Sequence, residues 1–350
     1  MKQKIIISGN LKTDLLTAIN ECEYDKLFVI TDDVTVQKCL PEIKDVCEEK
    51  HIRKITIKSS DVNKNIETLA YVWKHLGDMG ATRHSCVINL GGGMVTDLGG
   101  FAASTFKRGL NFINIPTTLL AMVDASVGGK TGINFNGLKN EVGVFCNSKT
   151  VIINTVFLKT LDKYNICSGY AEIIKHGLIS NSVMWKELMN FDLFENNLSE
   201  LQRMLADSIE VKERIVEADP NECGMRKALN FGHTVGHAFE SFGMKKNKPI
   251  LHGYAVAFGL VCELYLSVIK AGFPVDKMRT TVKYIKENYG NFVFTCDDYE
   301  SLFDLMTHDK KNIAGMINFT LLEDIGNIKI DQTASKEDIF ESFDFFRECN

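Results

Sequence analysis

The sequence predicts a doubly wound α/β domain over residues 1–160 and a mainly α-helical domain over residues 161–350. Three observations support this prediction. Short β-branched runs alternate with helical patterns in the first part of the chain, which is typical of parallel strands joined by crossover helices. From about Cys167 to Asn288, apolar residues recur instead with the 3.6-residue period of helices. A chain of 350 residues is also long enough for two domains, each with its own core.

The composition is typical of a soluble enzyme with a small-molecule substrate. The chain is 45% hydrophobic and has a net charge of -5, which argues against a global basic field for nucleic acid. Its first residues, MKQKIIISGN, contain too short an apolar run for a signal peptide. We expect no window to approach the ~20 apolar residues that a membrane span needs. Ten scattered cysteines without a C-x-x-C pair indicate reduced thiols and a cytoplasmic location.

The expected elements follow in chain order. Strands are expected in KLFVITDD, RKITIKS, SCVINLGGG, NFINIP and TVIINT, with a helix from about Ile66 to Gly80 after the second of them. The helical domain is expected to include GYAEIIKHGLI, LQRMLADSIEVKERIVEA, RKALNFGHTVGHAFESF and GYAVAFGLVCELYLSVIKAG. MINFTLLEDIG then indicates a hairpin or an edge strand, and a helix ends the chain.

A glycine-rich turn follows the strand in CVINLGGGMVTDLGGF. A strand that enters a helix through glycines offers backbone N–H groups and a helix dipole to a pyrophosphate. The dinucleotide fingerprint is incomplete, because Thr96 occupies the position of its third glycine. The alternative is a tight strand-to-helix turn without a ligand. Asp32, at the end of an earlier strand, either accepts a hydrogen bond from a ribose hydroxyl or caps a helix.

Residues 116–140 predict a basic loop. They contain GGKT, but a Walker loop needs glycine where this chain has Asp124, which argues against a P-loop. Lys130 and Lys139 lie among glycines, asparagines and threonines. A flexible loop of this composition can present ammonium groups and backbone donors to phosphate groups. The alternative is that both lysines are solvated.

A polar stripe marks the segment RKALNFGHTVGHAFESF. Its members are Arg226, Asn230, His233 and His237. Their spacing places them on one face of a single predicted helix, with apolar residues on the other faces. The two histidines have the spacing of H-E-x-x-H zinc peptidases, but Thr234 stands where those enzymes keep their base. A metal bound here would therefore do different work.

Catalytic zinc takes imidazoles and a carboxylate and keeps one position open. Further candidate ligands are Glu172, three residues before Lys175 in GYAEIIKHG, and His252 in ILHGYAV. Each of these residues alone is also compatible with a core or capping role. Gly232 and Gly236 each weaken a helix interior by ~1 kcal/mol relative to alanine, which indicates that something approaches the backbone closely.

Six segments occur in the order and approximate spacing of a known family. They are GGGMVTDLGGF, PTTLLAMVDASVGGKTG, LKN, GYAEIIKHG, ALNFGHTVGHAFE and LHGYAVAFG, within a stretch from about residue 55 to residue 326. In these segments the chain resembles the 3-dehydroquinate synthase family. The resemblance implies a Rossmann-like N-terminal domain, a helical C-terminal domain, and a cleft for NAD and a divalent metal, usually Zn²⁺ and otherwise Co²⁺. It also implies a homodimer.

The family converts 3-deoxy-D-arabino-heptulosonate 7-phosphate to 3-dehydroquinate and phosphate, the second step of the shikimate pathway towards aromatic amino acids. NAD transiently oxidises a metal-polarised alcohol, phosphate is eliminated, the hydride returns, and the ring opens and closes by an intramolecular aldol step. The enzyme alternatives are another sugar phosphate cyclase and a metal-dependent polyol dehydrogenase of the glycerol dehydrogenase type. The alternative from another class is a non-catalytic NAD-binding scaffold.

The resemblance also implies a role for individual residues. The implied metal ligands are Glu172, His233 and His252. The implied substrate neighbours are Asp124, Lys130, Asn140, Lys175, Lys212, Arg226, Asn230, His237, Lys310 or Lys311, and Arg108 from the neighbouring subunit. The implied NAD neighbours are Asp32, Asp61, Lys64, Gly92, Gly93, Asp97, Thr117, Thr118, Lys130, Lys139, Phe157, Leu158, Lys159 and Thr160. We expect methionine in place of Lys130, Lys175 or Arg226 to lower the rate with little change in stability.

Three positions depart from the family pattern. Ser60 and Asp61 replace the usual Gly-Glu pair before a lysine, and Val34 replaces an asparagine, so the adenosine-side contacts of NAD stay open. Tyr254 stands where the family commonly has glutamate, two residues after His252. Loss of that acid removes a partner of the metal site, unless the phenol or another acid substitutes.

Overall fold

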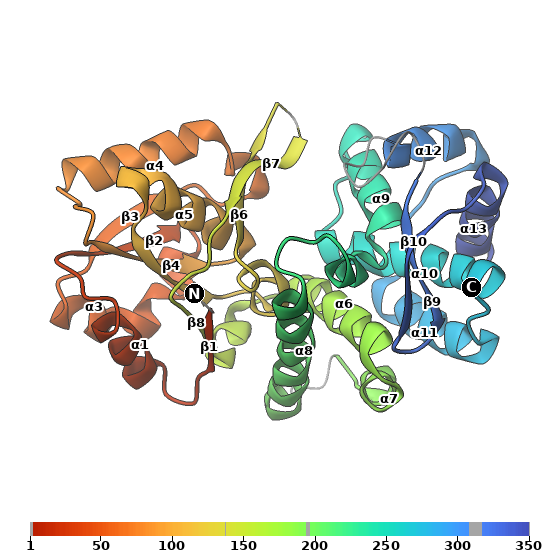
Figure 1. Cartoon of the computed structure of the whole chain (residues 1–350), viewed down its shortest axis with the longest axis horizontal. Coiled ribbons are helices and arrows are strands. Elements are labelled where there is room, and N and C mark those ends of the chain that lie inside the picture. The colour runs from red at the N-terminus through yellow and green to blue at the C-terminus, as the bar shows by residue number, and fades with distance from the viewer. Residues whose placement is uncertain (1–2, 137, 194–196, 308–316, 350) are drawn as a thin grey trace. The chain divides into compact units, whose positions relative to one another are not determined.

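The structure is a computed structural model that describes residues 3–136, 138–193, 197–307 and 317–349. The chain divides into two compact units, Met1–Asp162 and Lys163–Asn350, and the division falls two residues after the boundary expected from the sequence. Figure 1 follows the chain through both units. Lys310 and Lys311, which the sequence assigned to the substrate, lie outside the described residues.

A six-stranded sheet forms the core of the N-terminal unit (Figure 1). Its strands are β1 (Lys4–Ile7), β2 (Leu27–Asp32), β3 (Arg53–Ile57), β4 (Cys86–Gly91), β5 (Asn111–Pro116) and β8 (Thr150–Ile153), in the order β1-β8-β5-β4-β2-β3. All neighbouring strands are parallel. β2, β4 and β8 are buried along their whole length, which explains their continuous apolar runs. The predicted doubly wound α/β plan is confirmed.

Helices cover both faces of this sheet. They are α1 (Leu11–Asn20), α2 (Thr35–Lys38), α3 (Lys44–Glu49), α4 (Ile66–Asp78) and α5 (Gly93–Thr105), with the short turns η1 (Leu40–Ile43), η2 (Asp61–Asn63), η3 (Phe106–Arg108) and η5 (Thr155–Thr160). α4 and α5 lie over one face and α1 and α3 over the other (Figure 1). Leu69, Val72 and Leu76 recur at helical spacing on α4 and pack with Val95 and Leu98 of α5 in the core.

Residues 116–140, which the sequence predicted as a flexible loop, form regular structure that continues to Phe145. A π-helical turn, η4 (Ala121–Ala125), leads into an antiparallel hairpin of β6 (Lys130–Phe135) and β7 (Leu138–Phe145). Ile133 is buried in the core, and the backbone N–H of Asn134 donates to the carbonyl of Lys64 at 2.7 Å. The loop prediction was wrong because Thr131 and Gly132 pair with Val144 and Gly143 across a hairpin, which satisfies their backbone groups.

The C-terminal unit is mainly helical, as predicted. Its helices are α6 (Lys163–Ser180), α7 (Ser182–Asn190), α8 (Leu198–Ala218), α9 (His233–Lys245), α10 (His252–Ala271), α11 (Val275–Tyr289), α12 (Tyr299–Thr307) and α13 (Lys336–Glu348), with the turns η6 (Met225–Asn230) and η7 (Cys296–Asp298). The predicted hairpin consists of β9 (Phe319–Asp324) and β10 (Asn327–Gln332). Phe239 of α9 contacts the rings of Phe292, Phe294, Phe343 and Phe346, which form an aromatic part of the core.

The polar stripe does not lie on a single helix, which corrects the sequence prediction. Arg226 and Asn230 belong to η6, whereas the two histidines belong to α9. Gly232 separates the two halves at φ +82°, in the left-handed region that favours glycine. A Cβ at this position would also approach Leu260 Cδ2 to 2.7 Å. The chain therefore changes direction in the middle of the stripe.

α10 corrects a second expectation. By length and composition, it is long and apolar enough to cross a membrane. However, 67% of its apolar window is buried inside the unit, where it packs against α6, α9, α11 and α13. A helix that is apolar on most sides is here the central core helix of the C-terminal unit.

Candidate active site

Three side chains of the C-terminal unit form a cluster with the composition of a metal site. Glu172 lies on α6, and His233 and His252 are the first residues of α9 and α10. One ligand atom from each lies within 4.8 Å of the others. Glu172 Oε1 is 3.3 Å from His233 Nε2 and 3.7 Å from His252 Nε2. Ligands at ~2.1 Å from a tetrahedral Zn²⁺ are themselves ~3.4 Å apart, so the spacing fits such an ion.

The hydrogen bonds of the cluster also fit a cation. Glu172 is fully buried, and its Oε1 has no hydrogen-bond donor among the described residues. His233 Nδ1 donates to the carbonyl of Phe231 at 3.2 Å, and His252 Nδ1 donates to Glu240 Oε2 at 3.2 Å. When Nδ1 carries the hydrogen, a neutral imidazole offers the lone pair of Nε2 to a metal. Both Nε2 atoms lie beside the carboxylate oxygen that lacks a donor.

The two histidines of the cluster have opposite pKa shifts, and the pKa of Glu172 is lowered. Burial by itself raises the pKa of Glu172, but the ammonium of Lys175 and then His233 hold it well below its usual range. Burial lowers the pKa of His233 to about 3, against the attraction of Glu172. Burial also acts to lower the pKa of His252, but the neighbouring carboxylates of Glu172 and Glu240 outweigh this and raise it to about 10. Without a metal, the two carboxylates thus favour the charged form of His252, and a divalent cation bound at Nε2 would take the place of that proton.

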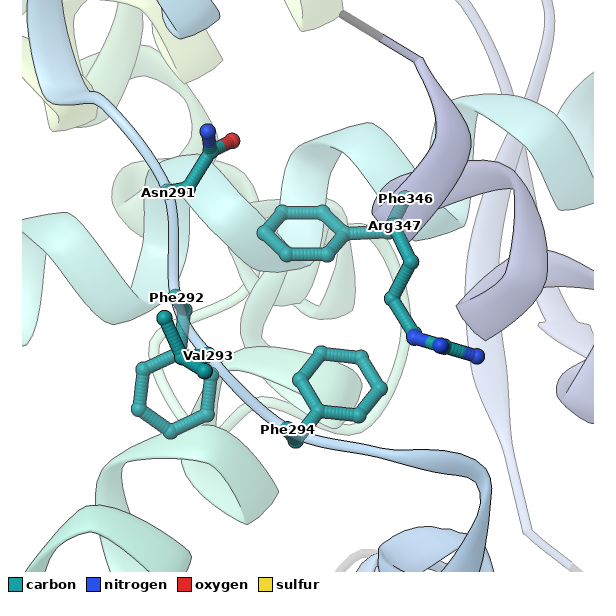
Figure 2. Close-up of a pocket in the computed structure, with 6 residues that line it drawn as sticks. All are labelled: Asn291, Phe292, Val293, Phe294, Phe346 and Arg347. Carbon is teal, nitrogen blue, oxygen red and sulfur yellow. The ribbon is translucent and has the colours of Figure 1, made fainter.

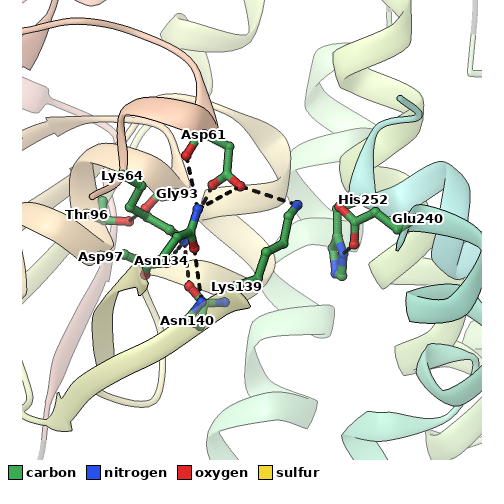
Figure 3. Close-up of polar contacts among 10 residues, drawn as sticks. All are labelled: Asp61, Lys64, Gly93, Thr96, Asp97, Asn134, Lys139, Asn140, Glu240 and His252. Atoms are coloured by element: carbon green, nitrogen blue, oxygen red, sulfur yellow. Dashed lines mark hydrogen bonds and ion pairs between the residues drawn. The ribbon is translucent and has the colours of Figure 1, made fainter. Parts of the chain in front are cut away.

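Glu240 is the residue that sequence reasoning missed. It lies on α9 at the end of the GHAFE segment, and its contact with His252 is drawn in Figure 3. A carboxylate in this position fixes the orientation of a ligating imidazole and makes it more basic. An acid on another helix therefore contacts His252, whereas the sequence has Tyr254 where the family commonly has glutamate. The ring of Tyr254 packs against Tyr289 instead, with centroids 5.1 Å apart.

Replacing Glu240 by alanine is expected to weaken metal affinity by about 10–100-fold, because His252 loses the partner that orients it. Tyr254→Phe is the matched control, since it retains the ring packing beside the same ligand. Titration with Zn²⁺ against a chromogenic chelator measures both variants. Equal affinities in wild type, Glu240→Ala and Tyr254→Phe would contradict the assignment of Glu240, and a loss confined to Tyr254→Phe would return the role to the phenol.

The other C-terminal residues assigned from the sequence lie on elements around this cluster. Lys175 is buried and forms an ion pair with Glu172, and Lys212 of α8 is also buried. The ring of His237 is 5.4 Å from that of His233 and 5.9 Å from that of His252. Arg226 Nη1 donates to the carbonyl of Pro220, and Asn230 Nδ2 donates to Glu222 Oε1. The last two contacts lie within η6 and the segment just before it.

In the N-terminal unit, the glycine turn lies where the central parallel strands end. Gly92 is the N-cap of α5, directly after β4, and a Cβ on it would approach Thr118 Cγ2 to 3.0 Å. The backbone N–H of Thr117 donates to the carbonyl of Gly91, which joins the ends of β4 and β5. Ligands of open α/β sheets bind at such carboxyl ends, and a helix N-terminus there favours a phosphate group.

A polar network lies in the same unit (Figure 3). Lys64 is buried, and its Nζ is 3.0 Å from Asp97 Oδ2 and 2.6 Å from Asn140 Oδ1. Lys139 Nζ is 3.3 Å from Asp61 Oδ2. Burial raises the pKa of Asp97 despite the nearby ammonium of Lys64, whereas Lys64 and Lys139 outweigh burial and lower the pKa of Asp61. Four residues that the sequence assigned to NAD, Asp61, Lys64, Asp97 and Lys139, therefore lie in one group with Asn140, which it assigned to the substrate.

The structure favours the capping interpretation of Asp32. Its Oδ1 accepts hydrogen bonds from the backbone N–H groups of Val34 at 2.9 Å and Thr35 at 2.7 Å, at the start of α2. These hydrogen bonds stabilise the turn before α2, and they account for the carboxylate without a contact to a ribose.

The remaining N-terminal assignments are spread over several elements. Asp124 lies in η4, Lys130 begins β6, and Arg108 is exposed in η3 with φ +71°. Phe157, Leu158, Lys159 and Thr160 form most of η5, in which the first two side chains are buried.

A separate cavity of about 190 Å³ lies in the C-terminal unit between the segment 291–294 and α13 (Figure 2). It is lined by Asn291, Phe292, Val293, Phe294, Phe346 and Arg347. Its walls are largely aromatic, and Arg347 is hydrogen-bonded to the hydroxyl of Tyr299. Because this lining brings no carboxylate or imidazole, the cavity does not have the chemistry of the cluster.

Comparisons with known proteins decide the family. A 3-dehydroquinate synthase N-terminal family model matches residues 54–168, and a 3-dehydroquinate synthase C-terminal model matches residues 169–312. A 3-dehydroquinate synthase of Parabacteroides distasonis is 54% identical over 347 residues, which cover 99% of this chain and 98% of the relative. The chain belongs to the 3-dehydroquinate synthase family. The family predicted from the six sequence segments is thus confirmed, and the chain is an enzyme of the phosphate-eliminating cyclase type.

Solved structures show that the fold of this family is shared with related cyclases. A 2-deoxy-scyllo-inosose synthase complexed with carbaglucose-6-phosphate, NAD⁺ and Co²⁺ aligns with a TM-score of 0.85 at 20% identity, covering 98% of this chain and 96% of that chain. A 2-epi-5-epi-valiolone synthase from Streptomyces hygroscopicus with NAD⁺ and Zn²⁺ bound also aligns at 0.85, with 21% identity and coverage of 100% and 98%. The predicted Rossmann-like and helical plan is therefore confirmed.

Proposed function

We propose that this chain converts 3-deoxy-D-arabino-heptulosonate 7-phosphate to 3-dehydroquinate and phosphate, with NAD and one divalent metal, Zn²⁺ or Co²⁺, held by Glu172, His233 and His252. The convergence of these three ligand atoms within 4.8 Å is the observation that carries the proposal. Three protein ligands leave a coordination position open, which is the catalytic rather than the structural pattern. Family membership supplies the reaction, and the cyclase structures with NAD⁺ and Zn²⁺ or Co²⁺ support both cofactors.

The bound metal supplies Lewis acidity to a substrate alcohol, and NAD accepts and returns a hydride. The chain's own residues hold the ligands for this chemistry. Lys175 compensates the charge of the buried Glu172, and Glu240 orients His252. His237 lies beside both imidazoles without belonging to the ligand set, so we assign it to the substrate or its phosphate.

Charged and amide side chains would hold the phosphorylated substrate. We assign this role to Asp124, Lys130, Asn140, Lys175, Lys212, Arg226, Asn230 and His237, and to Arg108 of the neighbouring subunit. Cations near a departing phosphate stabilise the negative charge that develops on it. The burial of Lys212 and Arg226 supports their assignment, because a buried cation interacts with an anion more strongly than a solvated one.

We assign NAD to the N-terminal unit. Gly92 and Gly93 at the start of α5 would meet the pyrophosphate, with Thr117 and Thr118 at the end of β5 beside them. The network of Asp61, Lys64, Asp97 and Lys139 and the turn Phe157–Thr160 complete the proposed set. The capping role of Asp32 weakens the case for its contact with a ribose.

We further propose a cytoplasmic homodimer. The ten cysteines are all free, which fits a reducing compartment. The exposed position of Arg108 after α5 suits a side chain that reaches a neighbouring subunit.

An assay of phosphate and NADH tests the proposed reaction. The reaction returns the hydride to the same molecule, so excess heptulosonate phosphate is expected to release stoichiometric phosphate without accumulating NADH absorbance. A polyol dehydrogenase would form one NADH per turnover and no phosphate. Steady NADH formation from a simple polyol, with no phosphate released from the heptulosonate phosphate, would overturn the proposal.

A further inference from the structure

The two histidines of the metal cluster occupy the same position in their helices. His233 is the first residue of α9, after the N-cap Gly232, and His252 is the first residue of α10, after the N-cap Leu251. The first backbone N–H groups of a helix have no partner within it, and an N-cap Ser, Thr, Asn or Asp usually accepts from one of them. Glycine and leucine cannot do so. Both ligand-bearing helices therefore need a cap from elsewhere.

Glu263 caps α9 from the neighbouring helix α10. This side chain is fully buried, and its Oε2 accepts from the backbone N–H of Gly232 at 2.6 Å. Its Oε1 accepts from the N–H of Val235 at 3.0 Å. Val235 is the third residue of α9, the one that an N-cap side chain would serve. Because Gly232 has no space for a Cβ, the capping group has to come from another helix.

Ser168 caps α10 in a similar way. Its Oγ accepts from the backbone N–H of Gly253, the second residue of α10, at 3.1 Å. Ser168 lies on α6, one turn before Glu172. The helix that carries Glu172 therefore caps the helix that begins with His252. That helix in turn caps the one that begins with His233.

The cap on α9 also bears on the orientation of the His233 ring. His233 Nδ1 donates to the carbonyl of Phe231, the residue directly before the turn that Glu263 holds through Gly232. If the turn moves, the carbonyl of Phe231 moves with it. This carbonyl holds the hydrogen on His233 Nδ1 and so leaves Nε2 available to a metal. A carboxylate at the start of α9 also offsets the positive end of the helix dipole close to a cation.

We propose that Glu263 and Ser168 are positioning residues that set the geometry of the metal ligands, because each caps a ligand-bearing helix from the helix of another ligand. This inference rests on the metal site proposed above. Glu263 has no part in the reaction itself. Its proposed role is to keep the spacing among Glu172, His233 and His252 fixed.

Glu263→Gln tests the inference in the full chain. The amide has the same size, but it places an N–H donor against one of the two backbone donors, so one cap bond is lost. We expect Zn²⁺ affinity, measured by competition with a chromogenic chelator, to fall by about 10–100-fold, as for other groups behind metal ligands. Ser168→Ala removes the acceptor for Gly253 and is expected to weaken Zn²⁺ binding in the same direction.

Ser267→Ala is the matched control. Ser267 lies on α10 one turn after Glu263 and is fully buried. Its hydroxyl donates to the backbone carbonyl of Glu263 at 2.7 Å and accepts from the backbone N–H of Leu322 of β9 at 3.1 Å, so its bond to Glu263 is to the main chain and not to the carboxylate that caps α9. Its replacement is expected to lower thermal stability, because a buried donor loses its acceptor, and to leave Zn²⁺ affinity unchanged. A loss of affinity in Ser267→Ala equal to that in Glu263→Gln would overturn the inference, because general loosening would then explain both.

His233→Ala separates the two proposals. If His233→Ala binds Zn²⁺ as tightly as wild type, the metal site itself is wrong. If His233→Ala loses Zn²⁺ while Glu263→Gln and Ser168→Ala keep wild-type affinity, the positioning role alone is wrong. Should Glu263→Gln fail to fold, Ser168→Ala decides by the same measurement.

Discussion

Replacing His233 or His252 by alanine is expected to remove bound metal and turnover together and to leave the fold intact. Each side chain is one of three proposed ligands, and the loss of a direct ligand exceeds the 10–100-fold loss of affinity that is typical of a residue behind the ligands. We expect the fold to survive because α9 and α10 are held mainly by their buried apolar residues, although His233 is itself buried. Metal content by mass spectrometry, phosphate release and far-UV circular dichroism check the three parts of this expectation.

His237→Ala is the matched control on the same helix. Its ring lies 5.4 Å from that of His233, but it is not part of the ligand set. We expect this variant to keep its metal and to lose rate, as suits a residue that contacts the substrate. Full metal content and a normal rate in His233→Ala or His252→Ala would remove that residue from the ligands.

Replacing Lys175 by methionine is expected to destabilise the metal-free protein by about 3–5 kcal/mol, the usual effect of removing one partner of a buried ion pair. Lys175 and Glu172 are 1% and 0% exposed and form such a pair. Without the ammonium, the Glu172 carboxylate is buried with less compensation. The sequence alone led us to expect a change of rate with little change in stability, and the burial of the pair is the reason for expecting a loss of stability as well. Urea unfolding of the metal-free variant measures the loss.

Two further variants make the experiment specific to the ion pair. Adding Glu172→Gln to Lys175→Met is expected to recover part of the lost stability, because the uncompensated charge is gone. Lys130→Met, at an exposed position that begins β6, is expected to stay within about 0.5 kcal/mol of wild type. Wild-type stability in Lys175→Met would show that the pair contributes little and would leave its role to the reaction alone.

The sequence by itself determined the fold class, the family and the identity of the candidate ligands. The parallel sheet could be predicted because β2, β4 and β8 are buried on both faces. Strands of this kind have continuous apolar runs, which can be recognised in the sequence. The family could be predicted because its six segments are local and keep their order. The resemblance also named Glu172, His233 and His252, whose ligand atoms the structure brings within 4.8 Å.

Some backbone features could not be predicted because their cause lies in distant contacts. The polar stripe has a spacing that fits a single helix as well as it fits two separate elements. Its members are Arg226, Asn230, His233 and His237. The turn at Gly232 arises where α10 leaves no space for a Cβ. The hairpin of β6 and β7 could not be predicted either, because the composition of this segment is typical of a loop. Only the pairing between the two strands makes it a sheet.

Only the tertiary structure decided which acids lie beside the proposed metal ligands. Glu240 reaches His252 across 12 positions of sequence, and Glu263 reaches Val235 and Gly232 across 28 and 31 positions. No periodicity within a helix relates such residues, because they meet through the packing of α9 against α10. The partner of a buried carboxylate on a helix therefore cannot be predicted from the sequence, because the donor lies on a neighbouring helix.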